Sequence, residues 1–146
     1  KILRDAKLLF QKFRETYSNK EIKLKVFVVD DSEILRERIV REISKIPRVE
    51  IIGEAETAQE AIDAIQIQKP DIVLLDIRLK IGNGIDVLYQ VKKEEPSPIV
   101  IIFTGFHHPH YRKRCEEEKA DYFFHKKDEF DKVIEVITDM SNKKEF

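Results

Sequence analysis

The sequence has little cysteine, little net charge and no long apolar run, and each shortage excludes a class of protein. Cys115 is its only cysteine, so no disulfide can form within the chain, and scant cysteine fits a reducing cytoplasm. The 27 basic and 28 acidic side chains leave a net charge of −1, which gives no broad attraction to nucleic acid or anionic lipid. No apolar run reaches the roughly 18 residues of a membrane span, and the charged first residues do not resemble a signal peptide. We therefore expect a cytoplasmic protein that binds neither nucleic acid nor membranes.

What the sequence does contain is a regular alternation of apolar runs and amphipathic stretches. Its 146 residues suffice for one domain with a sizeable core. Strands are predicted over 25–30, 49–55, 72–76, 99–103 and 122–125, and helices begin near residues 33, 58, 84, 107 and 128. The helix that follows the first strand should bury Ile34, Leu35, Ile39, Ile43 and Ile46. This order predicts an α/β fold with a parallel sheet and right-handed crossovers.

An amphipathic segment precedes the first strand. The apolar residues of 1–17 recur at spacings of three and four, which predicts a helix with one apolar stripe: Leu3, Ala6, Phe10, Phe13 and Tyr17. We place a boundary near Glu21, so that 1–20 form a helix and connector and 21–146 form the globular domain. Such a stripe is seldom left open on a soluble monomer. It could dock on its own domain, pair with a second subunit, or be the end of an upstream domain. The heptad-like spacing favours a homodimer or an upstream coiled-coil linker.

Side chains suited to phosphoryl chemistry stand at the carboxyl ends of four of the predicted strands. Asp30 ends the first strand and Asp31 follows it, Asp76 ends the third, and Thr104 and Lys126 follow the fourth and the fifth. The ligand site of an open α/β sheet lies beyond the carboxyl ends of its strands, so these side chains should share one cleft. Three converging carboxylates repel one another and are normally neutralised by a cation, and Mg²⁺ suits all-oxygen ligands. A carboxylate can also attack phosphorus and form an aspartyl phosphate.

The sequence around these residues resembles the receiver domain of two-component response regulators. The matching motifs are 28–32, 74–77, 82–84, 103–105 and 120–126, and the resemblance extends from about residue 24 to 141. It implies a flavodoxin-like fold, with a five-stranded parallel sheet in the order 2-1-3-4-5, helices on both faces and an extra N-terminal helix.

The resemblance also implies roles for the acidic residues. Asp76 would be the phosphoacceptor. Asp31 and Asp76 would bind Mg²⁺, or Mn²⁺ as an alternative, by side chain. Asp30 would bind largely through water, and Arg78 through its backbone carbonyl. Taken singly, Asp76 could be no more than a helix cap; the other strand-end residues favour the functional interpretation.

Residues of the fourth and fifth strands and the loops after them would sense the phosphoryl group. Thr104, Gly105 and Lys126 would bind its oxygens, although Thr104 could merely cap a helix and Lys126 could be a solvated lysine at a strand end. Phe123 stands where the family usually has a rotating aromatic switch residue, and Tyr122 is the competing assignment.

Two large side chains would border the path of attacking water, Arg78 and Phe106. Their size predicts slow self-dephosphorylation. The sequence departs from the family pattern at Lys80 and Lys127, where prolines are frequent, and the peptide bond before Lys127 is expected to be trans.

Together these observations predict a phospho-accepting signalling switch and not an enzyme. A histidine kinase or phosphotransfer partner would donate the phosphoryl group. No output domain follows the last predicted helix, so output would be contact with a downstream protein, or the chain is a fragment of a longer regulator. One alternative is a Mg²⁺-dependent phosphatase with an aspartyl nucleophile, but Arg78 stands where such enzymes usually have a second acid. The other is a receiver-like scaffold that is never phosphorylated, which the intact acidic set argues against.

Overall fold

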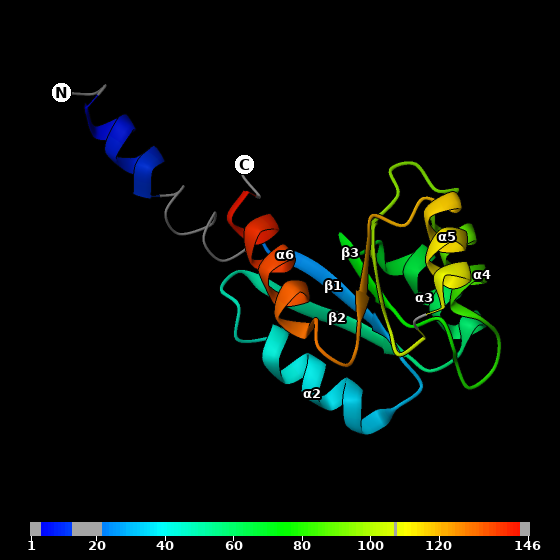
Figure 1. Ribbon diagram of the computed structural model, residues 1–146. Coiled ribbons are helices and arrows are strands. Elements are labelled where there is room, and N and C mark those ends of the chain that lie inside the picture. Colours follow the sequence, from blue (N-terminus) through cyan, green and yellow to red (C-terminus); the bar gives the residue numbers. More distant parts are fainter. Residues whose placement is uncertain (1–3, 13–21, 107, 144–146) are drawn as a thin grey trace.

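The computed structural model describes residues 4–12, 22–106 and 108–143, and it contains the expected five-stranded parallel sheet in the order β2-β1-β3-β4-β5 (Figure 1). The strands are β1 (Leu24–Val29), β2 (Val49–Ala55), β3 (Ile72–Leu75), β4 (Ile99–Thr104) and β5 (Tyr122–His125). The helices between and after them are α2 (Glu33–Ile43), α3 (Ala58–Gln68), α4 (Gly84–Val91), α5 (Pro109–Glu117) and α6 (Phe130–Lys143). A helix over 4–12 precedes β1. The predicted fold class is confirmed.

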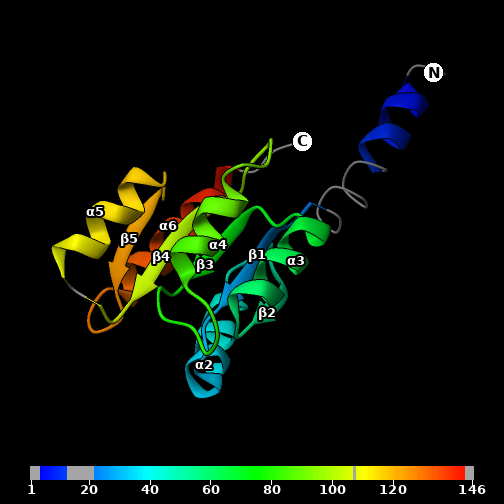
Figure 2. The same cartoon turned by 90° about the vertical axis from the view of Figure 1, so that its right-hand side faces the viewer.

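Helices cover both faces of the sheet, and two apolar clusters result. Side chains alternate along each strand, so Val26 and Val28 face one side of the sheet while Phe27 and Val29 face the other. The first side packs against α2 and α6, and the second against α3, α4 and α5 (Figure 2). Because both faces are covered, β3 is buried along its whole length, as its unbroken apolar run predicted.

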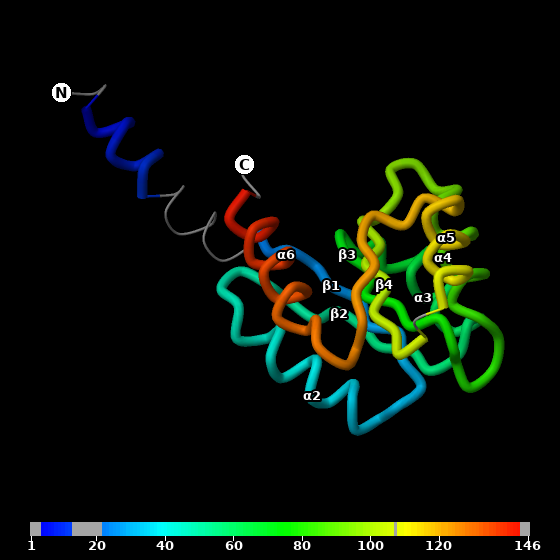
Figure 3. The backbone as a smooth tube through the Cα atoms, viewed as in Figure 1, coloured from blue at the N-terminus to red at the C-terminus, as the bar shows by residue number. Residues whose placement is uncertain are grey.

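Local capping begins three of the helices directly after a strand-end loop. The side chains of Ser32, Thr57 and Asn83 accept hydrogen bonds from main-chain N–H groups in the first turns of α2, α3 and α4. The connections that end in these caps are three residues long before α2, two before α3 and eight before α4, and Figure 3 traces their course. The caps fix where the last residues of these connections lie.

The prediction that Ile34 faces the core is wrong. Its side chain is 82% exposed, whereas Ile39 and Ile43 are buried. Arg36 takes the inward position on the first turn of α2 and is also buried. At 3.6 residues per turn, Ile34 lies roughly 160° around the helix from Arg36. The face of α2 that meets the sheet therefore excludes Ile34.

The N-terminal helix makes no buried contact within the described part of the chain. All of 4–12 is exposed, including Leu8 at 57%, Leu9 at 72% and Phe10 at 64%. The described residues thus give no support to docking on the chain's own domain. The boundary at Glu21 and three predicted stripe residues, Leu3, Phe13 and Tyr17, lie outside the described residues.

Among the helices of the described ranges, none has the length and apolar character that a membrane span requires.

Candidate functional site

The three predicted carboxylates meet at the carboxyl edge of the sheet. β1 and β3 are neighbours with Val29 opposite Leu75, so the residues that follow them, Asp30 and Asp76, emerge side by side. Both are buried, whereas Asp31 is exposed. One carboxylate oxygen from each of the three lies within 4.8 Å of the others. This group could hold a metal ion, and its donors are the hard oxygen ligands that Mg²⁺ prefers.

Lys126 reaches back from the end of β5 to both buried acids. Its Nζ lies 2.6 Å from Asp30 Oδ2 and 2.6 Å from Asp76 Oδ2. Burial by itself would lower the pKa of Lys126, but the hydrogen bonds to Asp30 and Asp76 and the negative charges of both acids together outweigh burial, and the pKa is raised. Lys126 therefore remains an ammonium group that holds the two carboxylates together.

Asp76 has a pKa above the ordinary value for aspartate. Burial is the main cause and the charge of Asp30 adds to it, while hydrogen bonds from Lys126 and the Thr104 hydroxyl oppose the rise. Asp76 Oδ1 also accepts the N–H of Ile77 at 2.7 Å. A buried, perturbed carboxylate in a cluster of acids is typical of a functional site and costs stability at neutral pH.

The loop after β3 is folded tightly against Asp76. The N–H of Gly84 donates to the carbonyl of Ile77 at 2.7 Å. A Cβ at position 84 would collide with the main-chain oxygen of Asp76, so only glycine lets α4 begin this close to the site. Within the loop, Arg78 and Asn83 form an isolated antiparallel bridge. Arg78, the predicted carbonyl ligand, is thus held in the loop that leaves Asp76.

A second layer covers the site from the loop after β4. Thr104 is fully buried, and its Oγ1 accepts the N–H of Phe106 at 3.2 Å. The guanidinium carbon of Arg78 lies 4.7 Å from the centre of the Phe106 ring, a cation–π contact that joins the loops after β3 and β4. Gly105 is exposed, and a Cβ added to it would meet no atom within 4 Å. The structure therefore brings Arg78 and Phe106 together, and it gives no steric reason for glycine at position 105.

The two candidates for the aromatic switch point in opposite directions on β5. Phe123 is 7% exposed and Tyr122 is 39% exposed. The Arg112 guanidinium carbon from α5 lies 5.5 Å from the centre of the Phe123 ring. Phe123 thus links β5 to α5, whereas Tyr122 lies toward solvent.

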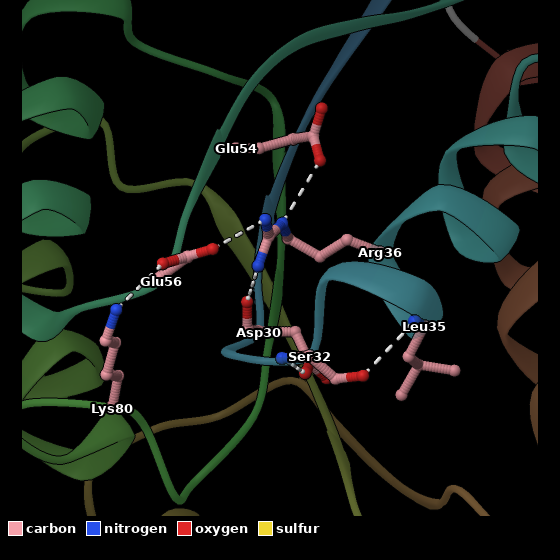
Figure 4. A network of polar contacts seen from close by, with 7 residues as sticks. All are labelled: Asp30, Ser32, Leu35, Arg36, Glu54, Glu56 and Lys80. Atoms are coloured by element: carbon pink, nitrogen blue, oxygen red, sulfur yellow. Dashed lines mark hydrogen bonds and ion pairs between the residues drawn. The ribbon is translucent and has the colours of Figure 1, made fainter.

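The residue that sequence reasoning missed is Arg36. Its guanidinium binds the main-chain oxygen of Asp30 and the side chains of Glu54 and Glu56 (Figure 4). The available signal was its spacing of three and seven residues from Ile39 and Ile43, which puts an arginine on the apolar stripe of α2.

Comparison with known proteins gives one family. Residues 26–138 match the response regulator receiver domain family. A protein-glutamate methylesterase/protein-glutamine glutaminase of Geobacillus kaustophilus is 38% identical over 79 residues, which cover 54% of this chain and 23% of that protein. The sensory transduction protein LytT of Bacillus anthracis is 30% identical over 122 residues, which cover 84% of this chain and 49% of that protein. The chain therefore spans half or less of the length of these curated relatives.

Solved structures agree with the sequence match. A DNA-binding response regulator of the LuxR family from Staphylococcus aureus superposes with a TM-score of 0.75 at 25% identity, covering 82% of this chain and 99% of that one. The response regulator domain of Thermotoga maritima CheB superposes with a TM-score of 0.72 at 25% identity, covering 84% and 99%.

Proposed function

The chain belongs to the response regulator receiver domain family, whose members are phospho-accepting switches of two-component systems, and we propose that Asp76 is its phosphoacceptor. The observation that carries the assignment is the meeting of Asp76, Asp30, Asp31 and Lys126 at one edge of the sheet. Asp76 stands at the end of the central strand. Its carboxylate contacts Lys126, the residue that would hold the phosphoryl oxygens once Asp76 is phosphorylated. Arg78 stands at the position where the phosphatase alternative needs an acid, and its side chain stacks on Phe106.

The acid cluster is the proposed Mg²⁺ site, with Mn²⁺ as an alternative ion. Asp31 and Asp76 would hold the ion by side chain, Asp30 through water and Arg78 through its backbone carbonyl. The all-oxygen donors and their mutual distances support this assignment. A bound divalent cation supplies neutralisation of the charge on the transferring phosphoryl group.

The proposed reaction moves a phosphoryl group from a phosphohistidine to Asp76. A carboxylate oxygen of Asp76 attacks phosphorus, an O–P bond forms, the N–P bond of the donor breaks, and the departing imidazole takes up a proton. Lys126 and Thr104, which already contact Asp76, would bind the phosphoryl oxygens. Their movement toward the new charge, with Phe123 as the switch residue, would repack the surface formed by α5, β5 and α6.

The first test is phosphorylation in solution. The chain incubated with acetyl phosphate and Mg²⁺ should gain the mass of one phosphoryl group, because the donor can replace a phosphohistidine when the receiver supplies the catalytic geometry. Intact-mass spectrometry measures the gain. The same reaction in EDTA should show none. A gain of equal rate with and without EDTA would contradict the proposed metal site.

The partners proposed for this domain are a histidine kinase or phosphotransfer protein and a downstream protein. The cytoplasmic location expected from the sequence stays a prediction. A homodimer through the N-terminal helix is supported by the exposure of Leu8, Leu9 and Phe10 together on a short helix, which is marginal in water without a partner surface.

The oligomeric prediction can be checked by truncation. We expect the full chain to form dimers and a chain beginning at Glu21 to stay monomeric, because only the full chain carries the exposed apolar helix. Analytical ultracentrifugation over a range of concentrations measures the mass of each chain relative to its own monomer. A full chain that is monomeric at every concentration would reject pairing through this helix.

A further inference from the structure

Arg36 has a buried guanidinium that contacts Asp30, a member of the acid cluster. Its side chain is 10% exposed, and its Nη1 donates to the main-chain carbonyl of Asp30 at 2.6 Å. Its Nε donates to Glu54 at 3.2 Å and its Nη2 to Glu56 at 2.9 Å, both from β2 and the loop that follows it. These three acceptors lie around one planar guanidinium, an arrangement that the single ammonium of a lysine cannot copy.

Glu56 extends this contact to the loop after β3. Its second carboxylate oxygen lies 3.8 Å from Lys80 Nζ, and its main-chain carbonyl accepts the N–H of Lys80 at 3.3 Å. Figure 4 marks the ion pair between Glu56 and Lys80. The N–H of Ala58 donates to the carbonyl of Ile81 at 3.0 Å in the same region. Contacts therefore run from Asp30, through Arg36 and Glu56, to the loop that contains Arg78.

The links in this chain of contacts are unequal. The bond from Arg36 to the Asp30 carbonyl is buried, and Glu56 is about one-third exposed. Glu54 is more exposed and binds the guanidinium at a longer distance, and no described contact connects it to the loop after β3. The Lys80 side chain is 66% exposed, so its ion pair with Glu56 should contribute little. Glu56 meets the loop after β3 mainly through its main-chain carbonyl, and its side chain matters because it ties that segment to Arg36.

We propose that Arg36 and Glu56 are positioning residues for the metal site, because together they hold the two loops that supply its ligands in one arrangement. The inference rests on the proposed function, since it assumes that Asp30, Asp31, Asp76 and the Arg78 carbonyl bind the cation. Neither side chain needs to touch the ion. Groups that orient metal ligands in this way typically change metal affinity by roughly 10- to 100-fold when they are removed.

The experiment is a Mg²⁺ titration of purified full chain by isothermal calorimetry, repeated with Mn²⁺ by electron paramagnetic resonance. We expect Arg36→Met to weaken binding by about tenfold or more. Glu56→Gln should weaken it several-fold, and Glu54→Gln should weaken it less than Glu56→Gln. Arg36→Lys should also bind the metal more weakly than the wild type, because lysine does not replace the guanidinium. Glu42→Gln is the matched control and should bind like the wild type, because it removes only an exposed ion pair between the end of α2 and Lys45, which lies just beyond the helix.

The results distinguish the positioning role from general destabilisation and from failure of the proposed function. All titrations are made at a temperature where urea unfolding shows each variant to be fully folded, and Glu56→Gln serves if Arg36→Met does not fold. Wild-type affinity in folded Glu56→Gln and Arg36→Lys would overturn the inference while leaving the proposed function intact. If instead the wild type binds Mg²⁺ no more tightly than Asp31→Asn, the metal site itself is wrong, and the proposed function fails with it.

Discussion

Replacing Asp76 by asparagine will abolish phosphorylation by acetyl phosphate, while replacing Asp71 by asparagine will leave it intact. The two acids flank the same strand, β3, at opposite ends. Asp76 contacts Lys126 at the acid cluster, whereas Asp71 accepts the N–H of Lys25 at the other end of the strand. An amide at position 76 lacks the carboxylate oxygen that must attack phosphorus. Intact-mass spectrometry over time gives the rate for each chain, and an equal gain in Asp76→Asn would show that another residue is the acceptor.

The same substitution should not weaken the fold at neutral pH. Burial raises the folded-state pKa of Asp76, so the stability associated with this group is present at low pH and is lost as the pH rises through that pKa. At neutral pH the ionised side chain is a cost that asparagine removes, and Lys126 still has Asp30 as a partner. We expect the free energy of unfolding of Asp76→Asn in EDTA to equal or exceed that of the wild type, with the difference shrinking as the pH is lowered. Urea unfolding at several pH values measures it. A less stable Asp76→Asn at neutral pH would mean that the carboxylate stabilises the fold.

The second large effect concerns how long the phosphoryl group persists. We expect slow self-dephosphorylation in the wild type, because Arg78 and Phe106 are stacked at 4.7 Å between the two loops that border the site. A cation–π contact is worth about 0.5–2 kcal/mol. If water can attack only after this contact breaks, its loss lowers the barrier to hydrolysis by that energy and should speed decay by roughly 2- to 30-fold. Phe106→Ala and Arg78→Ala should both shorten the lifetime. The measurement follows loss of phosphoryl mass after the phosphodonor is removed.

A matched control is available on α4. Lys93 Nζ lies 4.1 Å from the ring centre of Tyr89, a similar contact that does not border the site. Tyr89→Ala removes that stack and should leave the decay rate unchanged. If Phe106→Ala and Arg78→Ala decay at the wild-type rate as well, large side chains at these two positions do not control water access.

The strands and the acids at their ends could be read from the sequence because their signals are local. The run Ile72–Leu75 is wholly apolar and is followed at once by Asp76, and the caps Ser32 and Thr57 stand directly before the helices that they begin. Parallel strands present their carboxyl ends at one edge, so the strand order was enough to predict that these side chains would meet. No distance between them was needed for that conclusion.

Tertiary structure alone decided which side of α2 faces the sheet and which side chains touch across loops. Hydrophobicity predicts a buried Ile34 and an exposed Arg36, but Ile34 is exposed and Arg36 is buried. The side of a helix that packs is set by elements far away in the sequence. The stack of Arg78 on Phe106 and the contacts of Arg36 with Glu54 and Glu56 join residues that only the folded sheet brings together. Such contacts depend on how strands are ordered and helices rotated, so no local pattern encodes them.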